Sequence, residues 1–307
     1  MELNKISQEL WQPIGANDRQ KEKIARPSMT YWQDAWRRLR KNKLAMLGLF
    51  MIVIIFALAI AGPWFSSYTY SEQNLLRGNE GPSVEHWFGT DAHGRDLFVR
   101  VLYGARISLA VAVIATLVNF CIGVVYGGIS GYMGGKVDNI MMRIVDVIST
   151  IPLVLYAIIL MVVIGSGLKS IIITLGTIYW VKMARIVRGQ VLSLKEQEYV
   201  LAAKTLGAST WRILLRHLIP NAMGVIIVTM TMQIPSAIFT ESFLSFIGLG
   251  VSAPMSSWGS LASDSLGGLR SYPYQLFFPS AAICITMLAF NFLGDGLRDA
   301  LDPRLRK

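Results

Sequence analysis

Residues 198–220 of the 307-residue chain read Glu-Tyr-Val-Leu-Ala-Ala-Lys-Thr-Leu-Gly-Ala-Ser-Thr-Trp-Arg-Ile-Leu-Leu-Arg-His-Leu-Ile-Pro, between two long apolar runs. The pattern predicts a helix, a break and a second helix. Ala202 and Ala203 allow close approach, and Gly207 tolerates the positive φ at which a helix often ends. Pro220 is expected to start the next apolar helix. A two-helix protrusion of this kind on a membrane protein would suit docking into a cleft of a partner.

The composition indicates an integral membrane protein. Hydrophobic residues make up 53% of the chain and charged residues 16%, and the mean hydropathy is +0.47. These values are too apolar for an ordinary soluble domain. A hydrocarbon core of about 30 Å takes roughly 20 helical residues to cross, and six runs are long enough or nearly so. We therefore expect an all-α fold with six transmembrane helices, at 44–62, 106–130, 139–164, 168–188, 222–247 and 275–294.

The distribution of Lys and Arg predicts the orientation of these spans. With both termini in the cytoplasm, 17 basic residues fall in the cytoplasmic segments 31–43, 131–138, 182–216 and the tail from 295. Five fall in the external segments 63–104, 165–169 and 248–274. The reverse orientation would place most of the positive charge outside, so we expect an N-in, C-in topology. The net charge of +10 then reflects anchoring at the inner leaflet and gives no reason to expect a nucleic-acid partner.

The remaining organisation follows from the charge pattern. Trp32, Ala35, Trp36 and Leu39 recur at helical spacing among basic residues, which indicates an amphipathic helix on the membrane surface, although a frayed basic flank is the alternative. The expected parts are a mobile cytoplasmic tail at 1–30, an interfacial helix at 31–43, the first transmembrane helix at 44–62, an external loop at 63–105, a five-helix transmembrane core at 106–294 containing the cytoplasmic loop 189–221, and a cytoplasmic tail at 295–307.

A glycine stripe lies at the end of the second span. Gly123, Gly127, Gly131 and Gly135 recur at every fourth position and follow one face of a helix. Such a face lets another backbone approach closely in lipid. The partner helix is either in the same subunit or in another one, and the sequence does not distinguish the two. A lipid-facing stripe is not expected in either case.

Ionisable residues inside spans are the usual indicators of function. Arg143 and Asp146 lie three residues apart, and we expect them to pair with each other in preference to relaying protons. Glu241 has no local partner. It either lines a transport pathway, where it could meet the amino end of a substrate, or makes a structural hydrogen bond to a neighbouring helix. Basic residues at the cytoplasmic end of the fourth span are expected to act as anchors or loop contacts, namely Lys182, Arg185 and Arg188.

The sequence offers no catalytic or cofactor site. The phosphate-binding pattern Gly-x4-Gly-Lys-Ser/Thr is absent, so the chain gives no sign of binding ATP. His86 and His93 share an external segment with Asp91 and Asp96, but their spacing matches no known metal-ligand set, and no metal is expected. We therefore predict a non-catalytic protein.

Five motifs outside the opening stretch carry a family resemblance: 86–96 (HWFGTDAHGRD), 103–109 (YGARISL), 242–250 (SFLSFIGLG), 256–264 (SSWGSLASD) and 291–303 (NFLGDGLRDALDP). With them, the chain after about residue 31 resembles the C-type permease subunit of oligopeptide and dipeptide ABC importers. The oligopeptide branch is the most similar. The dipeptide, antimicrobial-peptide and nickel branches share most of these motifs.

Within this resemblance, residues 198–220 are similar to the "EAA" loop by which such permeases contact their ATPases. The usual Glu before the two alanines is replaced by Leu201, and Glu198, one helical turn earlier, is the candidate substitute. The resemblance thus implies that coupling to an ATPase rests on Glu198, Ala202, Ala203, Gly207 and Pro220.

The resemblance also implies the fold, the partners and the location. The fold would be that of a type I ABC importer permease. A homologous B-type permease would complete the translocation pathway, two ABC ATPases would hold the ATP and Mg, and an extracytoplasmic binding protein would deliver peptide. This chain would bind no cofactor of its own and would lie, surrounded by lipid, in the plasma membrane of a prokaryote. An autonomous channel or secondary carrier is the alternative, but no pair of broken spans with midplane charges is evident.

Overall fold

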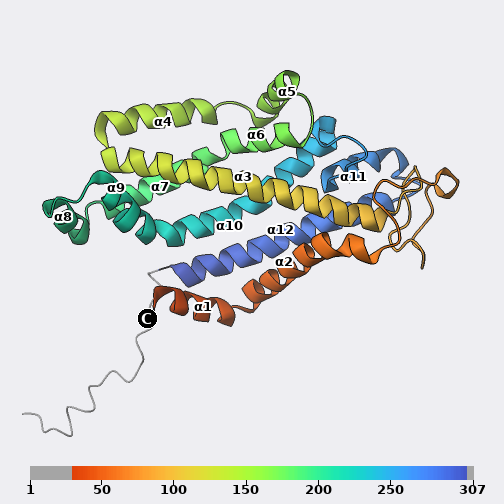
Figure 1. Ribbon diagram of the computed structural model, residues 1–307, viewed down its shortest axis with the longest axis horizontal. Helices are drawn as coiled ribbons and strands as arrows, with labels where there is room; N and C mark the ends of the chain where they lie inside the picture. The colour runs from red at the N-terminus through yellow and green to blue at the C-terminus, as the bar shows by residue number, and fades with distance from the viewer. Residues whose placement is uncertain (1–29, 303–307) are drawn as a thin grey trace, which may run out of the picture.

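The computed structural model describes residues 30–302, which form a bundle of helices lying side by side along the long axis of the molecule (Figure 1). Within that range the only β-structure is an isolated bridge between Thr90 and Asp96. The α-helices are α1 Tyr31–Lys41, α2 Lys43–Ala61, α3 Leu97–Met133, α4 Gly135–Ser149, α5 Leu153–Ile164, α6 Leu168–Ile178, α7 Trp180–Leu194, α8 Glu198–Thr205, α9 Thr210–Ile213, α10 Ile219–Leu244, α11 Trp258–Asp264 and α12 Tyr274–Leu301.

The long helix α3 runs through the centre of the bundle, where it packs along α7 and α10 (Figure 1). Helix α12 packs on both α10 and α2, and α4 and α5 lie on the opposite side of α3. Residues 66–96 gather at one end of the molecule, here called the loop end. Helix α8 projects from the other end, here called the α8 end.

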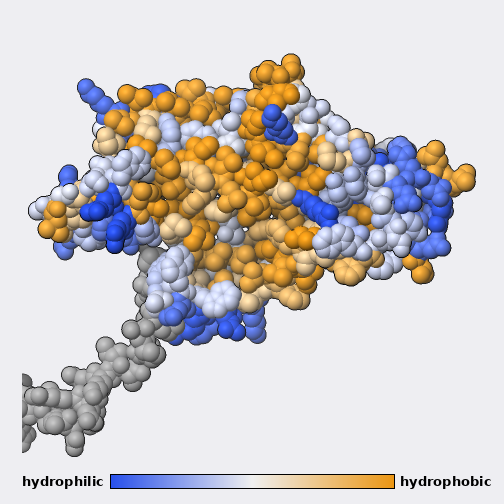
Figure 2. Space-filling view, in the orientation of Figure 1, coloured by the Kyte–Doolittle hydropathy of each residue, from blue (hydrophilic) through white to orange (hydrophobic). Residues whose placement is uncertain are grey.

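Five helical segments of the described range are long and apolar enough to cross a membrane, or six if the bent pair α4 and α5 counts as one span. Hydrophobic residues cover the middle of the face seen in Figure 2, and hydrophilic residues gather toward its two ends. The prediction of an all-α membrane protein is confirmed. Residues 1–29 of the predicted tail 1–30 and the last five residues of the predicted tail 295–307 lie outside the described residues.

The second span begins earlier than hydropathy predicts. Helix α3 starts at Leu97 where 106 was expected, so the segment 63–105 is not wholly a loop. Asp96 sets the start, because one of its carboxylate oxygens accepts the Val99 N–H at 2.8 Å and satisfies a free donor of the first turn. Further along α3, the Arg106 guanidinium donates to the carbonyl oxygens of Ala59 and Ile60. These carbonyls belong to the last turn of α2, and the guanidinium supplies hydrogen-bond donors that the helix itself lacks there.

The third span, expected as one helix at 139–164, is broken. Helices α4 and α5 meet at an angle of 84°. Pro152 lacks an N–H and disfavours helical geometry in the residue before it, so a straight helix cannot continue through it. The hydroxyls of Ser149 and Thr150 donate to backbone carbonyls at 2.7 Å and satisfy part of the end of α4.

The segments predicted as a cytoplasmic loop and a C-terminal tail are largely helical, and the helix, break and helix predicted at 198–220 lie within the loop. In the cytoplasmic loop predicted at 189–221, α7 continues to Leu194 and α8 and α9 follow, while α12 extends to Leu301 through most of the predicted tail. The end of α12 is held by packing against the N-terminal helices, because Ala300 and Leu39 share a small buried cluster and the Tyr31 hydroxyl donates to the Leu301 carbonyl at 3.1 Å. Helix α1 ends at Lys41, since Asn42 caps α2 by accepting the Ala45 N–H.

Three glycines of the predicted stripe hold α3 against α7. A Cβ atom at Gly127 would lie 2.3 Å from the Ala184 carbonyl oxygen, and one at Gly123 would lie 2.5 Å from the Met183 Cβ. A Cβ at Gly131 would lie 2.8 Å from the Arg188 carbonyl oxygen. This stripe therefore packs within the subunit. Gly135 does not belong to it, since it has a φ of 53° and opens α4, and a Cβ added there would meet no atom within 4 Å.

We expect Gly127→Ala to lower the thermal unfolding temperature of the purified protein in detergent. Even a methyl group overlaps the α7 backbone, and such overpacking typically costs about 1–3 kcal/mol. Gly189→Ala on α7 is the matched control, because a Cβ there meets nothing within 4 Å. Equal unfolding temperatures for the two variants would contradict the close contact.

Candidate functional site

The segment 198–220 forms the protrusion at the α8 end (Figure 1). Helix α8 ends at Thr205, and Gly207, two residues further on, has a φ of 81° that suits glycine. The Gly207 N–H donates to the Lys204 carbonyl at 3.0 Å. Ser209 then caps α9 by accepting the Arg212 N–H at 3.4 Å. The chain therefore folds here as a helix, a glycine break and a second helix.

Pro220 does not mark the start of the next span. Helix α9 passes through a π-helical turn, Leu214–Leu218, directly into α10, so that the helical segment Thr210–Leu249 is continuous. Pro220 is the second residue of α10, where its missing N–H is tolerated because the π-helical turn before it has already changed the hydrogen-bond register. The break in this region is at Gly207 alone.

The outer side of the protrusion is apolar and uncovered. Leu206 is 87% exposed, Trp211 58% and Leu201 53%. We call these three residues, with the exposed Tyr199, the protrusion surface. Val200, on another face of α8, is buried in a core cluster with Ile213 and so anchors the helix. Apolar side chains exposed together at the tip of a membrane protein indicate a protein-protein contact.

The alanines and the acidic residue lie beside this surface. Ala202 is exposed and Ala203 half-buried. Glu198 is exposed in the first turn of α8, where the helix dipole favours a negative charge, and pairs with no basic side chain of residues 30–302. The sequence reading missed Leu206 and Trp211, although both are isolated apolar residues in a polar stretch.

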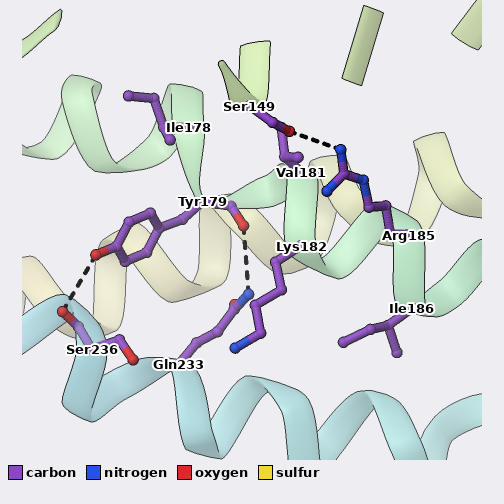
Figure 3. Close-up of a pocket in the computed structure, with 9 residues that line it drawn as sticks. All are labelled: Ser149, Ile178, Tyr179, Val181, Lys182, Arg185, Ile186, Gln233 and Ser236. Atoms are coloured by element: carbon purple, nitrogen blue, oxygen red, sulfur yellow. Dashed lines mark hydrogen bonds between the residues drawn. The ribbon is translucent and has the colours of Figure 1, made fainter. Parts of the chain in front are cut away.

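A cavity of about 590 Å³ lies between α7 and α10 (Figure 3). Tyr179, at the junction of α6 and α7, hydrogen-bonds Thr240 through its hydroxyl, and its carbonyl oxygen accepts the Gln233 side-chain amide at 3.5 Å. Ile178 and Ile186 add apolar surface on opposite sides of the cavity (Figure 3). Lys182 extends from α7 toward Gln233 of α10 (Figure 3).

The three basic residues of the fourth span differ in their partners. Arg188 forms a two-point ion pair with Asp138 of α4, and Arg185 pairs with Asp146 at 2.9 Å. The predicted pair between Arg143 and Asp146 is therefore wrong, because α7 packs close enough to α4 to supply a different guanidinium. Lys182 pairs with no acidic side chain in the described part of the chain.

Glu241 is fully buried inside the subunit. Its carboxylate accepts hydrogen bonds from Ser108 of α3 at 2.7 Å and from Ser245 at 2.8 Å. The Ser108 hydroxyl also accepts the Trp258 N–H at 3.3 Å, so the group joins α3, α10 and α11. This geometry corresponds to the structural alternative for Glu241, since the carboxylate is fully buried and accepts hydrogen bonds from Ser108 and Ser245 of the same subunit.

The loop end is held by a buried charge cluster. Asp91 pairs with Arg95 at 2.6 Å and also with Arg100, and it accepts the His93 and Arg95 N–H groups. His86 contacts the Asp96 carboxylate at 2.8 Å through Nδ1. Burial by itself would raise the pKa of Asp91, but the two guanidinium groups hold it below its ordinary value. Residues 30–302 contain no group of three or more His, Cys, Asp or Glu able to hold a metal.

The arrangement defines a multi-span membrane subunit with a cavity between α7 and α10 and an uncovered helical protrusion at one end. The model of the family "binding-protein-dependent transport system inner membrane component" matches residues 123–307, and that of the "N-terminal TM domain of oligopeptide transport permease C" matches residues 30–82. The chain belongs to the first of these families.

Curated relatives agree with this assignment. The oligopeptide transport system permease protein OppC of Bacillus subtilis is 55% identical over 99% of this chain and 100% of its own length. The dipeptide transport system permease protein DppC of the same organism is 56% identical over 94% of this chain and 91% of its own. The fold is similar to that of a chain of the MetNI methionine ABC transporter, solved in inward-facing conformations (TM-score 0.55, 18% identity, 66% of this chain and 96% of that one). The predicted family and type I permease fold are confirmed.

We expect the protein to lose thermal stability as the pH falls below about 4, near the ordinary pKa of an aspartate. Because the pKa of Asp91 is lowered in the folded state, its contribution is complete above the ordinary value and is lost as the pH falls through the folded one. Unfolding temperatures measured in detergent from pH 3 to 7 test this. The Asp91→Asn variant should have a lower unfolding temperature at neutral pH, and its unfolding temperature should fall less steeply below about pH 4. An unchanged fall in unfolding temperature at acid pH would contradict the assignment.

Proposed function

We propose that this chain is the permease subunit of an ABC importer for oligopeptides in the plasma membrane of a prokaryote. With a homologous B-type permease it encloses the pathway, and an extracytoplasmic binding protein delivers the peptide. Two partner ATPases bind ATP and Mg, and this chain hydrolyses nothing. The observation that carries the proposal is the protrusion surface, which presents exposed apolar side chains on α8 and α9, the two short helices between the spans α7 and α10.

Under this proposal both termini and the protrusion lie on the cytoplasmic side. The positive charge supports this orientation. With Lys182, Arg185 and Arg188 left aside because they lie within the candidate span Leu168–Leu194, 14 Lys and Arg residues fall in the segments it places inside and five in those it places outside. The loop end then faces the binding protein.

Coupling would run through the backbone. Helix α8 follows α7 after three residues, and α9 continues into α10. The protrusion is therefore attached directly to both of these spans. An ATPase that grips Leu206 and Trp211 and moves on ATP binding would displace α7 and α10 together. Such rigid-body movement is one of the known ways by which alternating access is achieved. Glu198 and the two alanines lie beside the gripped surface.

The cavity supports peptide over nickel as cargo. Its lining contains Lys182 and no carboxylate, which disfavours a divalent cation that would need anionic or imidazole ligands. Curated relatives include a dipeptide permease at similar identity, so dipeptides are the second candidate within the same family. Antimicrobial peptides would fit the same cavity chemistry. An autonomous carrier would leave the protrusion surface without a role.

We expect Gly207→Pro to abolish coupled uptake while the subunit still inserts. Proline fixes φ near −65° and cannot adopt 81°, at a cost of about 3 kcal/mol or more to the local fold. Gly207→Asn is the matched control, because Asn tolerates positive φ and a Cβ there meets no atom within 4 Å.

The measurement is ATP-dependent uptake in cells that lack only this chain, with a labelled dipeptide, a labelled pentapeptide and nickel ion. Wild-type and Gly207→Asn genes should restore pentapeptide uptake, and Gly207→Pro should not. Restoration of dipeptide or nickel uptake alone would overturn the oligopeptide assignment. Full pentapeptide uptake by the Gly207→Pro variant would overturn the coupling assignment.

A further inference from the structure

Lys182 carries a charge that no protein group compensates within residues 30–302. It lies near the middle of the candidate span Leu168–Leu194, where a lone ammonium facing lipid would be costly. Charged residues at such depth face a bundle interior or a water-filled cavity and meet a partner there. The Lys182 side chain is exposed and lines the cavity between α7 and α10. Its position therefore calls for an anion inside that cavity.

The neighbouring Arg185 does not have this property. Its guanidinium turns away from Gln233 toward Ser149, to which it donates at 2.9 Å, and it pairs with Asp146 at the same distance (Figure 3). The positive charge of Arg185 is thus largely balanced, whereas that of Lys182 is not. Since none of the residues lining the cavity is acidic, the cavity favours an anion and disfavours a cation.

A second unmatched polar group lies across the cavity from Lys182. Gln233 is 3% exposed, and its side-chain oxygen Oε1 has no hydrogen-bond partner, while its Nε2 donates to the Tyr179 carbonyl. A buried acceptor without a donor costs free energy, and an incoming N–H group that reached it would remove that cost. Ile178 and Ile186 add apolar surface on two sides of the same space (Figure 3).

We infer that this cavity binds the C-terminal residue of a peptide in transit, with the carboxylate on the Lys182 ammonium. The inference rests on the proposed function and adds a recognition site to it. The terminal peptide N–H is directed to the Gln233 amide, and the terminal side chain packs on the isoleucines. The volume of about 590 Å³ lies within the range of about 300–1,000 Å³ that is usual for small-ligand sites.

This arrangement would recognise the C-terminal carboxylate of the peptide and not a particular side chain. A free ammonium terminus would be repelled by Lys182, so the peptide would occupy the cavity in one direction. Recognition by one cation and one amide leaves the sequence of the peptide largely unconstrained, as a general peptide carrier needs. Blocking the carboxylate should therefore cost the interaction with Lys182 and little else.

The test compares pentaalanine as the free acid with pentaalanine C-terminal amide, both labelled, in cells whose only copy of this chain is wild type, Lys182→Met, Lys182→Arg or Lys136→Met. Lys136 is an exposed cation of α4 outside the cavity and is the matched control. Uptake of each peptide is expressed relative to wild type with the same peptide, which removes any preference of the binding protein. Complex yield is measured in parallel.

Lys182→Met should reduce free-acid uptake about tenfold or more, because an ionic hydrogen bond is lost, and change amide uptake less than twofold. Lys182→Arg should restore the free acid, and Lys136→Met should leave both unchanged. Equal losses for the two peptides, with lower complex yield, would mean that Lys182 pairs with a partner subunit and would overturn the inference alone. Unchanged uptake of the free acid by the Lys182→Met variant would also overturn the carboxylate-site inference alone. Wild-type cells that take up neither peptide would refute the proposed cargo, and the carboxylate site with it.

Discussion

The close contact between α3 and α7 is the constraint on which the rest of the structure depends. Gly127 brings the α7 backbone to van der Waals distance of α3, and no residue with a side chain fits there without displacement. Once α7 is placed, its polar residues fall at fixed positions. Arg188 meets Asp138, Arg185 meets Asp146, and Lys182 is left in the cavity opposite α10. The packing of small residues thus determines the electrostatics of the transport region.

The ion pairs explain why α4 stays attached to the bundle although it is broken from α5. Helix α4 lies on the outside of α3 and α7 and has few buried apolar residues, of which Val145 is one. In lipid, apolar surface gains little by packing against other helices, so specific polar contacts carry more of the association. The Asp138 and Asp146 pairs, together with a hydrogen bond from the Ser130 hydroxyl to Asp138, supply those contacts.

The spans were predictable from the sequence because a hydrophobic run of roughly 20 residues, long enough to cross the bilayer, rarely occurs in a soluble protein. The ends and breaks of the spans were not predictable from hydropathy, because hydropathy carries no information on the Asp96 cap of α3 or on the bend that Pro152 causes between α4 and α5. Contacts between distant residues were also missed. The Arg143–Asp146 pair was preferred because the two residues are close in sequence. In the structure, however, α7 packs against α4, and Asp146 pairs with Arg185, 39 residues away. The cavity could not be predicted at all, because Lys182 and Gln233 come from different helices.

The α7 helix joins the cavity to the protrusion, which gives the two proposed sites a direct mechanical relation. Lys182 and Leu194 are twelve residues apart on one helix, or about 18 Å at 1.5 Å per residue. A helix held on one face by α3 behaves as a stiff rod over that distance, so movement of the protrusion relocates Lys182 with respect to Gln233 of α10. Separating these two groups would weaken any ligand that needs both. A bound peptide would therefore be released by the same movement that the proposed ATPase contact produces, without a separate gate at the cavity.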